Sequence, residues 1–91
     1  MNNWIPVSEK LPDGNGEIYE ECLEESQLVL VYGKDYQGED SYGLGRYIID
    51  HTYPDVSGWN GYMDDGWDLD HCTVTHWMPL PEPAINKYEY Q

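Results

Sequence analysis

The sequence predicts a mainly β protein, with α+β as the alternative, built on one small antiparallel sheet of about four or five strands and at most one short helix. Two segments carry this prediction. Residues 27–33, QLVLVYG, form an apolar run typical of a central strand, and residues 72–78, CTVTHWM, alternate between two faces. Nine glycines and six prolines disfavour long helices. A chain of 91 residues is expected to form a single domain, 1–91.

The N-terminal segment, residues 1–16, is expected to be extended and to pack on the sheet. Pro6 and Pro12 exclude a regular helix there, and the run DGNG at 13–16 predicts a turn. Its apolar side chains would anchor the segment to the sheet: Trp4, Ile5, Val7 and Leu11.

Residues 17–26, EIYEECLEES, support two predictions. Ile18, Tyr19, Cys22 and Leu23 follow the i, i+3, i+4 spacing of a short helix whose glutamates face water. Close acidic side chains repel one another, and so short a helix is marginal in isolation. An extended acidic arm is therefore the alternative.

Further strands are expected after the central one at 27–33. The run GLGRYIID at 43–50 predicts the next strand. Residues 51–70 are rich in turn residues, and short strand fragments are expected around 59–63 and Trp67.

The last strand, 72–78, is expected to place alternate side chains on opposite faces. One face would carry Val74, His76 and Met78, and the other Thr73, Thr75 and Trp77. The proline-rich tail, 79–91, should be extended, with Leu80 folding back onto the body. The side chains expected to be mostly buried are Trp4, Val29, Val31, Ile48, Val74 and Leu80.

Charge limits the partners that this chain can bind. Eighteen acidic residues and four basic ones give a formal net charge of −14, which repels nucleic-acid phosphates and anionic membranes. We therefore expect no direct nucleic-acid or membrane binding. A host protein with a basic surface is the expected partner, and the oligomeric state is left open. Solubility is the simpler use of the same charge.

The cysteines and the hydropathy pattern bear on location. Cys22 and Cys72 are too few for a disulfide framework and are expected to be free thiols. We expect no cleavable signal segment before Trp4 and no apolar run long enough to span a bilayer. A cytoplasmic protein, acting in the host cytoplasm, is the expectation.

No catalytic residue, metal site or cofactor is predicted. Asp70, His71, Cys72 and His76 are the best metal-like group, but the spacing of the histidines places them on opposite faces of a strand. The aspartates around Gly66 lack the pattern of a calcium loop. His76 is instead expected to lie on the inner face, to donate to a backbone carbonyl and to pack against a tryptophan.

Aromatic side chains among acids predict a protein-binding surface, because aromatic residues anchor partners and charges steer them. The candidate partner-binding residues are Glu20, Glu21, Glu24, Glu25, Tyr36, Tyr42, Trp59, Tyr62, Asp64 and Asp65. If the glutamates and the aspartates share a surface, they form one negative stripe. Trp4, Trp67, His76 and Trp77 are expected to be structural. A ligand pocket using Trp59 and Trp67, or a sugar platform, is the alternative.

Both ends of the chain carry distinctive motifs. WIPVSEKLP near the start, VLVY, a tryptophan after Gly66, and VTHWMPLPEP near the end resemble a small bacteriophage and prophage family, domain of unknown function 551. The acidic segment 17–26 and the loops 34–42 and 51–65 look longer than in the compact family pattern. The resemblance implies a phage origin and a small β-rich fold, and it implies no activity and no catalytic residues.

These observations together favour a phage-encoded, non-enzymatic interaction protein. Its acidic and aromatic surface would bind a host protein, with inhibition of a nucleic-acid-handling or defence protein by nucleic-acid mimicry as the sharper form of the hypothesis. A small-ligand-binding module with an aromatic pocket is the alternative.

Overall fold

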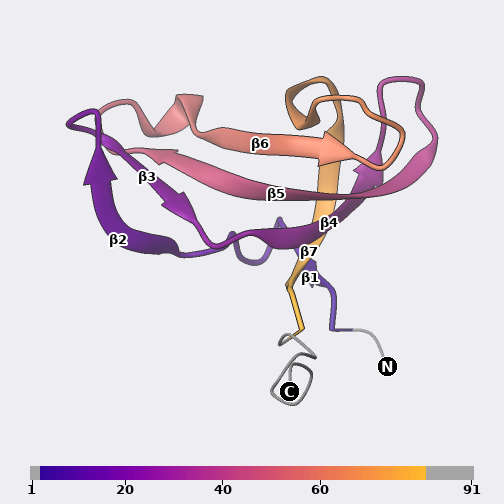
Figure 1. The fold of residues 1–91 in the computed structure, drawn as a ribbon, viewed down its shortest axis with the longest axis horizontal. Helices are drawn as coiled ribbons and strands as arrows, with labels where there is room; N and C mark the ends of the chain where they lie inside the picture. Colours follow the sequence, from indigo (N-terminus) through magenta and orange to yellow (C-terminus); the bar gives the residue numbers. More distant parts are fainter. Residues whose placement is uncertain (1–2, 82–91) are drawn as a thin grey trace, which may run out of the picture.

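The computed structural model describes residues 3–81, and these form one antiparallel sheet without any α-helix (Figure 1). The mainly β prediction is confirmed, but the sheet has seven strands rather than four or five. The strands are β1 Ile5–Pro6, β2 Gly14–Tyr19, β3 Leu23–Ser26, β4 Val29–Lys34, β5 Asp40–Asp50, β6 Gly58–Met63 and β7 Thr73–Pro79. Two single 3-10 turns complete the fold, η1 Pro54–Val56 and η2 Leu69–His71.

Strand β5 organises the sheet, because its 11 residues pair with three other strands. On one edge it pairs first with β4 and then with β3, and on its other edge it pairs with β6. The remaining strands extend the sheet outward, giving the order β1-β7-β4-β5-β3-β2. In Figure 1, β3 runs into β4 along β5, and β7 stands at a steep angle to β5 and β6.

The break between β3 and β4 is bridged by a buried serine. Ser26 is almost fully buried, and its hydroxyl accepts a hydrogen bond of 2.9 Å from the N–H of Tyr47. The same hydroxyl donates to the carbonyl of Gln27 at 2.7 Å. The side chain therefore replaces a ladder bond where the strand pairing is interrupted.

The acidic segment 17–26 is neither a helix nor an extended arm. It belongs to the β2–β3 hairpin, in which Tyr19 lies opposite Leu23. Glu20 and Glu21 occupy the tip with φ of 49° and 70°, and the N–H of Cys22 donates to the carbonyl of Tyr19. Two consecutive residues with positive φ make a turn that suits hairpin twist, but asparagine and glycine usually supply it. Helical spacing therefore gave the wrong element.

A bulge at Thr75 reverses the faces of β7. Tyr32 pairs with His76, and the next residue of β4, Gly33, pairs with Val74, so Thr75 is the extra residue. Val74 and Trp77 consequently both face the core, while His76 faces outward. The expectation that Val74, His76 and Met78 share a face is wrong for this reason, as is the inner position expected for His76.

The core lies on one face of the twisted sheet. Its buried members are Val29, Val31, Met63, Leu69, Val74 and Trp77. Ile5, Val7, Trp59 and Cys72 pack against this cluster from partly buried positions. The indole N–H of Trp77 donates to the carbonyl of Lys10 at 2.8 Å and thereby ties the N-terminal segment to the core.

Burial confirms half of the expected core. Val29, Val31 and Val74 are buried, whereas Trp4 and Ile48 are only half-buried. Leu80 remains 39% exposed and does not fold back into the core. Leu11, expected to anchor the N-terminal segment, is exposed as well, and its neighbour Pro12 is buried.

Two further expectations concern the ends of the chain. In the N-terminal segment 1–16, residues 1–2 lie outside the described residues; Ile5 and Val7 pack against the core, residues 7–9 form a turn, and the last residues belong to β2 rather than to a turn. In the tail 79–91, residues 82–91 lie outside the described residues. Within residues 3–81, no helix has the length and apolar character needed to cross a membrane.

Gly33 should be indispensable to the bulge. A Cβ there would overlap the backbone carbonyl of Thr73, which cannot move without breaking the β4–β7 pairing. We expect Gly33→Ala to lower the free energy of unfolding by about 1–3 kcal/mol in urea titrations. Gly58→Ala is the matched control, because a Cβ on that strand glycine meets open space, and it should change stability by about 0.5 kcal/mol or less.

Trp77 should contribute more to stability than its size alone suggests. Trp77→Phe removes the hydrogen bond to Lys10 and leaves a small void in the core, so we expect a loss of about 1–3 kcal/mol in the same assay. Tyr53→Phe, on a residue that is 64% exposed, is the control. Equal urea unfolding curves for the two variants would contradict the role given to Trp77.

Candidate functional site

The face of the sheet opposite the core carries exposed aromatic and aliphatic side chains. Strand pairing aligns them in two neighbouring rows, with Tyr32 between Tyr42 and His76, and Leu44 between Leu30 and Tyr62. Trp4 packs beside the first row. We call this surface the outer face, and it consists of Trp4, Leu30, Tyr32, Tyr42, Leu44, Tyr62 and His76. Tyr42 and Tyr62 are 56% and 63% exposed, so the surface is open to a partner.

A recess of about 350 Å³ lies in the first row and is lined by Trp4, Tyr32, Tyr42 and His76. The ring centroids of Tyr32 and Tyr42 are 5.0 Å apart, and that of Trp4 lies 6.0 Å from Tyr32 and 6.1 Å from Tyr42. The rings are tilted by 37° to 57° against each other. They support one another, so the recess has a preformed wall rather than mobile side chains.

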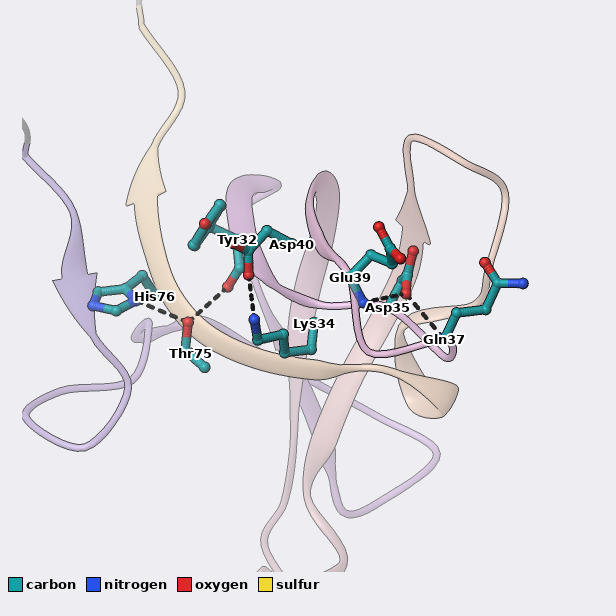
Figure 2. Close-up of polar contacts among 8 residues, drawn as sticks. All are labelled: Tyr32, Lys34, Asp35, Gln37, Glu39, Asp40, Thr75 and His76. Atoms are coloured by element: carbon teal, nitrogen blue, oxygen red, sulfur yellow. Dashed lines mark hydrogen bonds and ion pairs between the residues drawn. The ribbon is translucent and has the colours of Figure 1, made fainter.

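The bulge residue Thr75 fixes the orientation of His76 (Figure 2). The Thr75 hydroxyl donates its one hydrogen to the carbonyl of Tyr32 at 3.2 Å, and its oxygen lies 2.8 Å from Nδ1 of His76. With the hydroxyl hydrogen on the carbonyl of Tyr32, we assign the tautomer in which Nδ1 carries the hydrogen and donates it to Thr75. In the neutral ring, Nε2 is then a hydrogen-bond acceptor at the recess.

An ion pair lies beside the recess on the same two strands. The Lys34 ammonium donates to the Asp40 carboxylate at 2.6 Å (Figure 2), and the two residues pair across β4 and β5 two positions beyond the Tyr32–Tyr42 pair. Burial raises the pKa of the Tyr32 hydroxyl, and the charge of Asp40 raises it further. The pKa of Asp40 is lowered by Lys34, so the carboxylate stays ionised at the edge of the aromatic wall.

The predicted partner-binding glutamates lie on the β2–β3 hairpin and divide into two groups. Glu20 and Glu21 are exposed at the tip. Glu24 instead holds the hairpin together, because its carboxylate accepts from Nε2 of His51 at 2.8 Å and from the N–H of Gly16 at 2.6 Å. Its side chain is 14% exposed. Glu25 lies 3.9 Å from Arg46. Glu24 is therefore a structural residue in this fold.

The other predicted residues lie around the opposite end of β5. The N–H of Asp64 bonds the carbonyl of Tyr42, and its carboxylate accepts from the buried Ser41 hydroxyl at 3.0 Å. Leu23 pairs with Asp50 of β5, whereas Met63 pairs with Gly43. At about 3.3 Å per residue, the glutamates and aspartates are roughly 20 Å apart along β5. Figure 1 shows the turn between β2 and β3 at one end of β5 and the end of β6 at the other, so the two acidic groups do not form one negative stripe.

A second aromatic cluster joins the 35–39 turn to the loop after β6. Tyr36 stacks on Trp67 at 4.7 Å, and His71 packs edge-on against both rings. The Asp35 carboxylate accepts from the N–H groups of Gln37 and Glu39, and its proximity to Asp65 lowers the pKa of Asp35 and raises the pKa of Asp65. Tyr36, predicted for partner binding, and Trp67, expected to be structural, thus connect two loops through their stacked rings. Asp65, also predicted for partner binding, accepts from the N–H of Trp67 at 3.3 Å.

Trp59 faces the core side of the sheet. Its ring meets Tyr47 edge-on at 5.1 Å, and it lines an open hollow of about 500 Å³ with Ile48, Val56 and Cys72. Since Trp67 stacks on Tyr36 instead, the two tryptophans do not form the expected common ligand pocket. Trp59 packs as a core neighbour, away from Tyr42 and Tyr62 on the outer face.

Metal-like and nucleophilic groups offer little chemistry among residues 3–81. Asp68, Asp70 and His71 bring their ligand atoms within 4.8 Å of one another, and all three are exposed. His76 lies on β7 outside this group. Burial raises the pKa of the Cys72 thiol, and the charges of Asp65 and Asp35 raise it further. A raised pKa disfavours the thiolate that a nucleophilic cysteine needs.

Sequence reasoning missed Tyr32, although it is the centre of the recess. The signal was present in VLVYGK, because Tyr32 alternates out of phase with Val29 and Val31 and must face the other side of the strand. Trp4 and His76 were expected to be structural. The structure places both at the recess beside Tyr42, which was predicted for partner binding.

The fold and this surface define a small acidic β domain with an exposed aromatic sheet face. Over residues 3–84 the chain matches the family described as protein of unknown function (DUF551), and it belongs to that family. The resemblance seen in the terminal motifs is thereby confirmed. No curated protein matches the chain, and neither does any solved structure.

The contacts of Glu24 predict a pH-dependent stability. The hydrogen bond with His51 and then that from Gly16 lower its pKa below the ordinary value, so its stabilisation is complete above about pH 5 and is lost as the pH falls through the lowered pKa. We expect wild-type protein to lose more stability than Glu24→Gln between about pH 5 and about pH 3, as measured by urea unfolding at each pH. Glu21→Gln, at the exposed tip, should follow the wild type.

Proposed function

We propose that the protein is a phage-encoded, non-enzymatic interaction protein that binds a basic host protein through the outer face, in the host cytoplasm. The observation that carries this proposal is the exposed aromatic surface opposite the core, with Tyr42 and Tyr62 more than half exposed. Tyrosine and tryptophan are the residues that most often dominate interface energies. The phage origin rests on the resemblance of the terminal motifs.

Charge supports a basic partner. The chain carries a formal charge of −14, and the acids lie at both ends of β5, with the outer face between them. A field of this kind speeds association with a positively charged surface and weakens with salt. The aromatic side chains would then slow dissociation, since buried anchors govern off-rates. Inhibition of a nucleic-acid-handling or defence protein would follow if the basic surface is that protein's nucleic-acid groove.

A small-ligand-binding module remains the second candidate because of one observation. The recess of about 350 Å³ has the size of a small-molecule site and combines aromatic walls with a few polar groups. Under this alternative, a metabolite rather than a protein would contact Tyr42 and His76. The two candidates differ in the area contacted, because a ligand would leave Leu44 and Tyr62 free.

Capture of host proteins by three versions of the chain tests the proposal. Wild type and Tyr53→Ala, an exposed tyrosine beside η1, should retain the same host protein at low salt and release it at high salt. Leu44→Ser/Tyr62→Ala should lose that protein, because two neighbouring anchors of the outer face are gone. The captured protein is then purified and titrated against each version.

The titration decides the outcome. We expect the double variant to bind the purified partner at least about tenfold more weakly than Tyr53→Ala, mainly through faster dissociation. Equal affinity of all three versions would reject the outer face as the interface. Binding of a small metabolite that is insensitive to Leu44→Ser/Tyr62→Ala would favour the ligand-binding alternative.

A further inference from the structure

The recess on the outer face combines three features that point to one kind of side chain. Its walls are aromatic, its histidine presents an acceptor, and the chain that forms it has a formal net charge of −14. We infer that the recess binds the guanidinium group of an arginine side chain, supplied by the partner. The inference rests on the proposed function, which gives only a basic partner, and it adds the residue that anchors that partner.

The aromatic walls favour a flat, weakly hydrated cation. Trp4, Tyr32 and Tyr42 pack in mutual contact, with centroids 5.0 to 6.1 Å apart, so they leave no closed cage between them. What they offer is ring surface beside an open recess. A guanidinium is planar and stacks on such surfaces, whereas an ammonium is compact and strongly hydrated.

The acceptor comes from the bulge. Because Nδ1 of His76 donates to Thr75, the lone pair of its Nε2 is left for a donor from outside. Among residues 3–81, Nε2 of His76 makes no hydrogen bond. A guanidinium has five N–H donors and no acceptor, so it can satisfy Nε2 while it stacks on the rings.

The charge beside the recess does not by itself select a cation, because Lys34 is paired with Asp40. The Asp40 carboxylate accepts from the Lys34 ammonium at 2.6 Å. Lys34 neutralises much of this local charge. The attraction for a cation therefore comes from the ring faces, from Nε2 and from the overall charge of −14.

Short peptides test the inference without knowledge of the partner. The probes are three acetylated and amidated pentapeptides, Gly-Gly-X-Gly-Gly, in which X is arginine, lysine or citrulline. Citrulline keeps the planar shape of arginine and removes its charge. Each peptide is titrated into the isotope-labelled protein while the NMR signals of the Trp4 indole N–H and the His76 ring are followed.

We expect the arginine peptide to shift both signals with a measurable dissociation constant. The citrulline peptide should bind about tenfold more weakly because it loses the cation–π attraction, and the lysine peptide should fall between the two. Tyr42→Ala and His76→Phe should each weaken the arginine peptide about tenfold, the first by removing a ring and the second by removing Nε2. Tyr53→Ala should bind like wild type.

Three results would overturn the inference. They are equal binding of the arginine and citrulline peptides, signal changes confined to residues outside the recess, and a methyl glucoside that shifts the same signals at lower concentration than the arginine peptide. None of these three results would change the outcome of the capture experiment, because a basic protein could still dock on Leu44 and Tyr62. Conversely, loss of capture specificity with retained arginine binding would remove the proposed partner and leave the recess as a guanidinium site.

Discussion

The extra residue at Thr75 is the constraint on which both sides of the sheet depend. Without it, strict alternation along β7 would place Trp77 opposite Val74, outside the core. The bulge brings both into the core and turns His76 outward. It is held in place by close backbone approach at Gly33 and by the hydroxyl of Thr75 on the carbonyl of Tyr32. One local irregularity thus completes the core and the recess together.

The regular part of the fold could be predicted from the sequence, and the irregular part could not. The apolar runs of β4 and β5 and the burial of Val29 and Val31 follow directly from hydrophobic pattern. The β2–β3 hairpin did not, because its tip uses two glutamates with positive φ where a glycine would normally announce the turn. The bulge and the recess escaped prediction for a different reason. Both depend on contacts between residues more than 40 positions apart, such as Thr75 with Tyr32.

The acidic residues do several different things in this fold, although their number suggests one purpose. Glu24 closes a hairpin, Asp35 holds the turn that follows it, and Asp64 satisfies a buried serine. Other acidic side chains make no such contact among residues 3–81 and carry charge into solvent, among them Glu20 and Glu21 at the hairpin tip and the exposed Glu9 and Asp55. Part of the negative surface of this protein therefore comes from carboxylates that stabilise turns. These contacts do work that a larger hydrophobic core would do in a bigger domain.

The pairing of β1 with β7 has a consequence for how the protein is made. Ile5 lies opposite Trp77, and Trp77 bonds Lys10 across 67 positions of sequence. Contacts of such long range form late, because a large loop must close before they are gained. Strands β4 to β6 can assemble while the chain is still leaving the ribosome, whereas the N-terminal strand must wait unpaired for β7. The recess, which needs Trp4 from one end and His76 from the other, therefore comes into being only after nearly the whole domain has been translated.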